Sequence, residues 1–276
     1  MYGIGEDQPA LNSASLGVFM DWAIVAVGCT LGLIIGSFLN VVILRLPGGQ
    51  SIVSPRSQCP ACGLAIAWYD NLPILSYLYL LGKCRGCAKR ISPRYPLVEG
   101  MTAVLFGYAV YRFGLTIDLA ASIVLLSALV AITFIDLDHR IIPNEISIPG
   151  IPIGFAFGAL RESVGPTDAG LGILIGGGAL FAVAYLYEKI RGREGMGMGD
   201  VKLLAMIGGF AGWQGVLITM ITGSIVGTVV GLALMIRERG TLQLAIPFGP
   251  FLALGAAFHL FWGGELLGWY LQMTSP

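Results

Sequence analysis

Long runs of apolar residues, separated by short polar segments, cover most of the chain. A helix that crosses a bilayer needs about 20 mostly apolar residues. Eight segments reach or approach this length, at residues 22–44, 96–113, 117–135, 146–160, 170–187, 203–212, 215–236 and 244–271. The sixth is short and glycine-rich, and the period-2 alternation of a membrane β-barrel is absent from the sequence. The pattern predicts an all-α polytopic membrane protein with about eight transmembrane helices.

The composition supports this fold class and argues against others. Of 276 residues, 56% are hydrophobic and 12% are charged, whereas an ordinary soluble domain has about 25% charged residues. Intrinsic disorder is excluded, because it requires low hydrophobicity and high net charge. The formal net charge is +0, so the chain lacks the basic excess that neutralises nucleic-acid phosphates. We therefore expect contacts with membrane lipid and none with nucleic acid.

The distribution of basic residues predicts the orientation of the helices. The polar segment 1–21 contains no Lys or Arg, so we place it in the periplasm and alternate the loops from there. The inside segments of this topology are 45–95, 136–145, 188–202 and 237–243. They hold fourteen of the 16 Lys and Arg residues, and the outside segments hold only Arg112 and Arg161. Because cytoplasmic loops of membrane proteins are rich in Lys and Arg, this division supports the count of eight helices.

The largest segment between predicted helices, residues 45–95, contains two C-x-x-C motifs. Cys59 and Cys62 form the first pair, Cys84 and Cys87 form the second, and 21 residues separate the pairs. Two such motifs at this spacing predict a four-thiolate zinc site. A pair of disulfides is the alternative, which the reducing cytoplasm disfavours. With four protein ligands the zinc would be structural, and it would stabilise a domain too small to build a large core.

Three acidic residues lie at inside ends of predicted helices, where charges are costly and therefore informative. Asp136 and Asp138 follow the third predicted helix, and Asp200 precedes the sixth. Two carboxyl groups at close range do not both ionise, so one can keep a proton while the other activates water. In the structural alternative, Asp136 or Asp138 caps a helix or pairs with Arg140. Asp200 would likewise be favoured by the dipole of the helix that it begins.

Several motifs stand in a defined order along nearly the whole chain after residue 30. They lie at residues 36–43 and 45–47, 56–62, 68–76, 84–87, 91–99, 136–144, 195–203 and 247–250. Their order and spacing resemble the type IV prepilin peptidases, the bifunctional leader peptidases and N-methyltransferases of pilus and type II secretion systems. The segment from Gly197 to Asp200 is similar to the Gly-x-Gly-Asp element of membrane aspartyl proteases.

The resemblance implies that Asp136 and Asp200 are the catalytic pair, because Asp136 stands seven residues before Pro143, as the family's first aspartate does. It further implies cleavage of a prepilin or pseudopilin leader after a glycine, on the cytoplasmic side of the bacterial inner membrane. Methylation of the new N-terminus with S-adenosylmethionine would follow. The implied organisation is a periplasmic segment 1–21, a first helix 22–44, a methyltransferase-associated zinc insert 45–95 and a seven-helix peptidase domain 96–276.

Other residues have more than one possible role. Asp70, Asn71 and Glu99 belong to matched motifs and could serve methyl transfer, folding of the zinc insert or contacts with lipid headgroups. No methyl-donor motif identifies the cofactor-binding residues. Lys202 could tune the charge of the aspartate pair or anchor its helix on the inside. The prolines of 247–250 would break the start of the last helix.

Two other functions are compatible with the predicted helices. One is a proton-coupled transporter whose zinc insert binds a partner. Transporters commonly show internal repeats and polar residues along their helices, whereas the acidic pair here lies at helix ends. The other is a peptidase that lacks methyltransferase activity and uses the zinc insert to dock its substrate.

Overall fold

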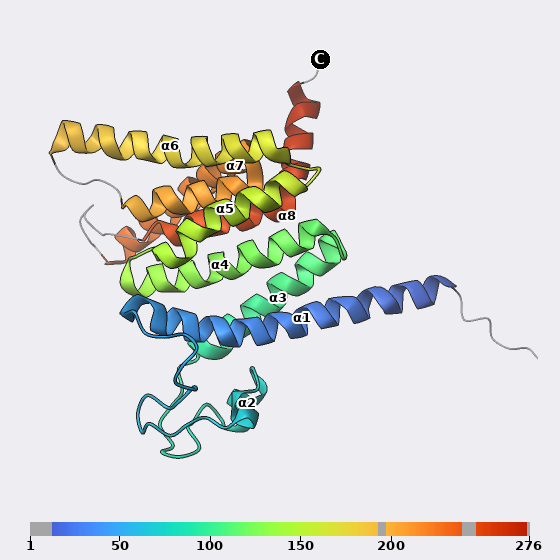
Figure 1. Ribbon diagram of the computed structural model, residues 1–276, viewed down its shortest axis with the longest axis vertical. Helices are drawn as coiled ribbons and strands as arrows, with labels where there is room; N and C mark the ends of the chain where they lie inside the picture. The colour runs from blue at the N-terminus through green and yellow to red at the C-terminus, as the bar shows by residue number, and fades with distance from the viewer. Residues whose placement is uncertain (1–12, 193–196, 239–246, 275–276) are drawn as a thin grey trace, which may run out of the picture.

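The computed structural model describes residues 13–192, 197–238 and 247–274 (Figure 1). Its elements are α1 (Ser13–Arg45), the 3-10 helices η1 (Leu46–Gly48) and η2 (Trp68–Asn71), α2 (Leu75–Tyr79), α3 (Arg94–Phe113), α4 (Ile117–His139), α5 (Asn144–Leu160), α6 (Gly165–Arg191), α7 (Met198–Glu238) and α8 (Gly249–Thr274). Apart from two isolated β-bridges, these parts of the chain contain no strand. The predicted all-α fold class is confirmed.

Apart from residues 247 and 248, which precede α8, the predicted segments are helical wherever the structure describes them, but several helices extend beyond the predicted ends. Helix α1 is already helical at Ser13 instead of starting at residue 22, and α4 continues past residue 135 to His139. The prediction that Asp136 follows the helix was therefore wrong, since this residue lies within its last turn. A helix continues wherever backbone hydrogen bonds form, so a loss of apolar side chains does not mark its end. Residues 244–246 of the last predicted segment lie outside the described residues.

Helix α7 consists of two antiparallel helices. Gly212 interrupts it with φ 70° and ψ 179°, a conformation that glycine adopts at little steric cost. Leu204 and Val216 both lie against Gly176 of α6, although a straight helix would separate them by about 18 Å. The chain therefore reverses direction at Gly212. The predicted division between segments 203–212 and 215–236 is confirmed.

The first half of α7 forms the centre of the bundle. Its core side chains are almost completely buried, namely Leu203, Leu204, Met206, Ile207 and Phe210. They belong to the largest core cluster, together with side chains of α4 and α8, and α7 also packs against α5 and α6. Glycines allow this close approach, since a Cβ on Gly176 would lie 2.6 Å from the carbonyl oxygen of Leu204. The shortest predicted segment is thus short and glycine-rich because other helices surround it.

Within the described residues, five helices are long and apolar enough to cross a membrane, by length and composition. They are Trp22–Gly48, Ile117–His139, Gly165–Arg191, Met198–Arg237 and Gly249–Thr274. Helix α3 carries three charged residues, and α5 has 17 residues with two internal prolines. Both nevertheless pack in the bundle, α3 against α1 and α5 against α7. The eight predicted segments therefore form one bundle, in which five helices have the apolar length that membrane crossing requires.

The chain between α1 and α3 forms a separate small lobe, the insert (residues 46–93). It contains η1, η2 and α2 and is otherwise irregular. Figure 1 shows the insert beside the α1–α3 pair, on the side of that pair away from the remaining helices. The lobe therefore packs along the C-terminal part of α1 and the N-terminal part of α3, with Ile52 also reaching a cluster that includes α4.

Candidate functional site

The last turn of α4 directs its two aspartates to different partners. Asp136 is 5% exposed, and its Oδ2 accepts a hydrogen bond of 3.0 Å from the backbone N–H of Gly249, the first residue of α8. Asp138 forms an ion pair with Arg94 at the start of α3. Arg94 also donates through Nη2 to the carbonyl oxygen of Phe134, at 3.0 Å. The alternative in which Asp138 pairs with Arg140 is thus wrong.

Asp200 lies in the first turn of α7, half-buried, and interacts electrostatically with Asp136. Ile142 connects the two positions. A Cβ on Gly199 would lie 2.9 Å from the Cβ of Ile142, and a Cβ on Gly249 would lie 3.4 Å from its Cδ1. The two glycines let α7 and α8 approach the end of α4. The structure therefore brings both carboxyl groups to one end of the bundle, and their catalytic role stays a prediction.

Two neighbouring features have specific local roles. Lys202 donates through Nζ to Oδ1 of Asn144 at 2.8 Å, which joins the start of α7 to the start of α5. Pro250 occupies the first turn of α8, where a proline costs no helical hydrogen bond. The helix consequently begins at Gly249, whose N–H is directed to Asp136. Residues 195–196 of the matched glycine motif lie outside the described residues.

The four cysteines of the insert form one cluster. Their Sγ atoms all lie within 4.8 Å of one another, and those of Cys59 and Cys87 are 4.0 Å apart. Zinc–sulfur bonds of about 2.3 Å in a tetrahedron place the sulfurs about 3.8 Å apart, so this donor set fits a metal ion. All four cysteines are free thiols, which contradicts the disulfide alternative.

Both C-x-x-C motifs fold into the same tight turn. In each turn the N–H of the first cysteine donates to the carbonyl five residues later, and a β-bridge closes the turn. Backbone N–H groups of Ala61 and Cys62 lower the pKa of the Cys59 thiol to about 6. A lowered pKa favours the thiolate, which is the form that binds metal at neutral pH. In the same turn the backbone hydrogen bond with Leu64 lowers the pKa of the Cys62 thiol, but burial and the neighbouring cysteine side chains outweigh it and raise this pKa to about 11, so the first turn favours the thiolate at Cys59.

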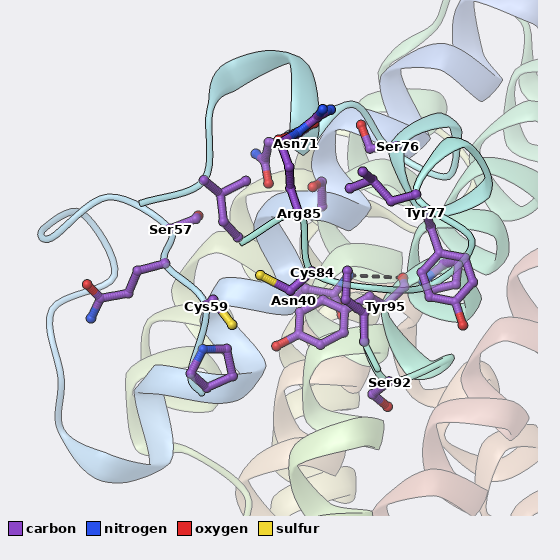
Figure 2. Close-up of a pocket in the computed structure, with 18 of the residues that line it drawn as sticks. Asn40, Ser57, Cys59, Asn71, Ser76, Tyr77, Cys84, Arg85, Ser92 and Tyr95 are labelled. Atoms are coloured by element: carbon purple, nitrogen blue, oxygen red, sulfur yellow. Dashed lines mark hydrogen bonds and ion pairs between the residues drawn. The ribbon is translucent and has the colours of Figure 1, made fainter. Parts of the chain in front are cut away.

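A cavity of about 460 Å³ lies between the insert and the bundle. Ligand pockets in proteins measure about 300–1,000 Å³. Figure 2 shows Asn40 of α1 and Tyr95 of α3 near Cys59 and Cys84, and Asn40 donates to the carbonyl oxygen of Tyr95 at 3.1 Å. The cavity therefore has the size of a cofactor site and lies directly beside the cysteine cluster.

Two carboxylates line this cavity in different ways. Asp70 accepts hydrogen bonds of 2.7 and 2.6 Å from Arg85, and these lower the pKa of the Asp70 carboxyl. Glu99 is 7% exposed and accepts a hydrogen bond of 2.8 Å from the N–H of Ile74. Ile74 has φ 57°, which is unusual for a β-branched residue. Glu99 thereby fixes the turn that precedes α2 and holds a buried carboxyl group at the cavity wall.

Known families match both parts of the chain. Residues 30–113 match the bacterial peptidase A24 N-terminal domain, and residues 123–232 match the type IV leader peptidase family. A prepilin leader peptidase/N-methyltransferase of Stutzerimonas stutzeri is 36% identical to this chain and covers 91% of it, with 95% of that protein aligned. The protein of the same name from Pseudomonas aeruginosa is 37% identical, and the alignment covers 90% of this chain and 94% of that protein. The protein of that name from Myxococcus xanthus is 45% identical, and the alignment covers 75% of this chain and 62% of that protein.

The chain belongs to the type IV leader peptidase family. The resemblance inferred from the motifs is confirmed, and this member of the family is a membrane protein. Asp136 and Asp200 lie in the part that matches the leader peptidase family, whereas the four cysteines lie in the N-terminal match. No solved structure matches the chain significantly.

Three contacts in this leader peptidase family member were not predicted from the sequence. They are the hydrogen bond from Gly249 to Asp136, the ion pair of Arg94 with Asp138 and the hydrogen bond from Ile74 to Glu99. Each lies in or next to a matched motif, which is the signal that could have identified it. The partners are 113, 44 and 25 residues apart, so no local spacing relates them.

We expect alanine at Gly249 to impair the site without unfolding the bundle. The added Cβ would lie 2.6 Å from Oδ2 of Asp136, which forces that carboxyl group to move. A displacement of this kind lowers the rate of leader cleavage by about 10²-fold, because catalysis depends on ångström-scale positioning. Gly264→Ala is the matched control on α8, since its Cβ would have no neighbour within 4 Å. Equal cleavage rates for the two variants would contradict a requirement for the Asp136 position.

Proposed function

We propose that this protein cleaves the N-terminal leader of prepilins or pseudopilins with Asp136 and Asp200 and then methylates the new N-terminal amine. The observation that carries this proposal is that the carboxyl groups of Asp136 on α4 and Asp200 on α7 lie at one end of the bundle and interact electrostatically, in a member of the type IV leader peptidase family. The full-length relatives bear the name prepilin leader peptidase/N-methyltransferase, which includes both reactions. The transporter alternative has no comparable support.

The chemistry of cleavage follows from two neighbouring carboxyl groups that share one proton. The ionised carboxylate takes a proton from water as the water oxygen attacks the scissile carbonyl carbon. The protonated carboxyl gives its proton to the carbonyl oxygen, so a neutral tetrahedral intermediate forms. Collapse of this intermediate breaks the C–N bond: the first carboxyl gives its proton to the leaving amine, and the second carboxylate takes a proton from one hydroxyl of the intermediate as the C=O bond re-forms, so both groups return to their starting states. The Gly249 N–H holds one oxygen of Asp136 in place throughout.

The orientation of this reaction is proposed from charge and from the positions of the two sites. Fourteen of the 16 basic residues fall in predicted inside segments, which supports an inner-membrane protein with these segments in the cytoplasm. Arg94, at the junction of the insert and α3, pairs with Asp138 two residues from Asp136. The insert and the aspartate pair therefore share one end of the bundle, which we assign to the cytoplasmic side. The zero net charge argues against a nucleic-acid partner.

The insert supplies the proposed methyltransferase site. We assign zinc to Cys59, Cys62, Cys84 and Cys87, where four thiolates would make it structural. We assign S-adenosylmethionine to the adjoining cavity, where its positively charged sulfonium carries the methyl group. Glu99 is the residue that would favour that positive charge, because Asp70 is already neutralised by Arg85. We further propose that 45–95 and 96–276 act as methyltransferase and peptidase units of one enzyme.

One assay tests both reactions. Purified protein in vesicles, given a prepilin and labelled S-adenosylmethionine, is expected to shorten the prepilin first and label the shortened product afterwards. Glu99→Gln is expected to cleave at the wild-type rate and to methylate about tenfold more slowly, because a charged hydrogen-bonding group is lost from the cavity. Glu188→Gln, on an exposed part of α6, should leave both rates unchanged.

The outcomes separate the two halves of the proposal. A wild-type protein that leaves the prepilin intact contradicts the peptidase assignment. Cleavage without labelling supports a peptidase alone. Full-rate methylation by Glu99→Gln contradicts only the placement of the methyl donor beside Glu99.

A further inference from the structure

The outer face of α2 is strongly apolar. Leu75, Leu78, Tyr79 and Leu81, which we call the outer patch, are 66%, 63%, 77% and 83% exposed. The opposite face of the same short helix lines the cavity through Ser76, Tyr77 and Leu80. Helix α2 therefore forms one wall of the cavity, and the outer patch lies on the side of the helix that faces away from the cavity. A soluble lobe that displayed so many large apolar side chains together would tend to associate or aggregate, so such a patch indicates a partner.

The position of α2 relative to the bundle identifies the partner. Ile74, which precedes α2, lies against Glu99 and Gly100, five and six residues into α3. At 1.5 Å per residue this is about 8 Å from the beginning of α3. Glu99 in turn lies beside Gly36 of α1, nine residues before that helix ends, or about 13 Å from its end. In Figure 1, α2 likewise lies within the length of α1 and not beyond its end.

The outer patch also continues an apolar stripe of α3. Leu97, Gly100 and Val104 share one face of that helix, because they are three and four residues apart. Leu97 and Val104 are 59% and 69% exposed, as expected of residues that face lipid. Ile74 packs over Gly100, within this stripe. Ile74, the residue before the outer patch, therefore joins the apolar stripe of α3 to the start of α2.

We propose that α2 and its flanking turns insert into the cytoplasmic leaflet, with the outer patch in contact with lipid acyl chains. The polar groups around the patch fit the headgroup region. The guanidinium of Arg85 lies 5.9 Å from the ring centroid of Tyr79. Trp68, which begins η2 seven residues before α2, is 73% exposed. Aromatic and basic side chains of this kind are typical of the boundary between headgroups and acyl chains. The insert is accordingly anchored in the membrane at two places, at α2 as well as at its helical ends.

Membrane insertion of α2 has a consequence for the cavity. Because the inner face of α2 forms its wall, the cavity would lie at the level of the headgroups instead of out in the cytoplasm. A cleaved substrate whose apolar helix stays in the bilayer would then need little movement to bring its new N-terminus to the cavity. This last step rests on the proposed function, whereas the contact with lipid does not.

Photolabelling from the acyl chains tests the contact without any substitution. The wild-type protein is reconstituted in vesicles of phosphatidylethanolamine and phosphatidylglycerol that contain a phospholipid with a diazirine on its acyl chain. After irradiation, mass spectrometry locates the labelled residues. Outer-patch residues should be labelled as strongly as Val104, and at least about fivefold more than Val53, which is 85% exposed in the same insert. A water-soluble diazirine should give the reverse order.

The result that overturns the proposal is equally direct. If Val104 is labelled from the acyl chains while the outer patch is labelled no more than Val53, then α2 faces water. The same conclusion follows if the water-soluble reagent labels the outer patch as strongly as Val53. Neither result depends on enzyme activity, so the outcome is independent of the proposed reactions.

Discussion

Asparagine at Asp136 or at Asp200 is expected to abolish leader cleavage, with a fall in rate of about 10³-fold or more. Each carboxyl group transfers a different proton. An amide can neither take a proton from water nor give one to the carbonyl oxygen. The loss should therefore be nearly the same for either variant and should not increase in the double variant, because the two residues act as one unit. The measurement is the initial rate of prepilin shortening by protein in vesicles.

Asp138→Asn is the matched control, from the same helical turn. Its side chain is 39% exposed and pairs with Arg94, and exposed ion pairs contribute only about 0–1 kcal/mol to stability. We expect this variant to cleave at close to the wild-type rate. If Asp138→Asn lost cleavage while Asp136→Asn kept it, the assignment of the pair would have to change.

The asparagine variants also distinguish catalysis from a structural role. Asp136 accepts a backbone hydrogen bond from Gly249 and joins α4 to α8, which is also the contact that a helix-packing residue would make. The amide oxygen of asparagine can accept the same hydrogen bond, and the side chain has nearly the same volume. A structural role therefore predicts little change on Asp136→Asn, whereas a catalytic role predicts complete loss. Retained thermal stability together with lost cleavage would identify the catalytic role.

The helices could be predicted from the sequence because membrane helices are long apolar runs, which hydropathy detects directly. Whether each helix faces lipid or other helices could not be predicted in this way. Residues 203–212 read like a weak membrane helix, yet Leu203, Met206 and Ile207 have no exposed surface and lie at the centre of the bundle. Lipid and a helix-packed interior both favour apolar side chains, so composition does not distinguish them. The glycines of this segment were the only signal of close packing.

The candidate sites differ in how far the sequence could predict them. Each cysteine pair closes a local turn, so spacing alone was enough to group the four thiols. Asp136 and Asp200 come from different helices, and only the family resemblance selected them over Asp138. The cavity could not be predicted, because its walls bring Asn40 and Glu99 from two helices against the irregular insert. Long-range packing of this kind leaves no periodic signal in the sequence.

Removal of the metal ligands is expected to have the second large effect. Serine at both Cys59 and Cys84 should eliminate bound zinc, because each motif loses one of the two thiolates that it directs toward the metal. Structural zinc contributes about 10–16 kcal/mol in small domains, comparable with or larger than the whole stability of a typical domain. We therefore expect the insert to unfold, the cavity wall to be lost and methylation to cease. Metal content by elemental mass spectrometry and the methylation rate measure these effects.

The fifth cysteine provides the control. Cys29 lies in α1, packed against Gly107 of α3 and away from the cluster, so Cys29→Ser should keep one zinc ion and full methylation. The bundle should remain folded in the double variant, because the buried residues of its core clusters come from the helices, and from the insert Leu46 and Ile52 pack against them. We therefore expect cleavage to persist when methylation is lost. Protein that is free of metal and still methylates at the wild-type rate would contradict a structural zinc in this activity. Simultaneous loss of cleavage and methylation would instead indicate that the insert also positions the substrate for the aspartates, because these variants leave Asp136 and Asp200 unchanged.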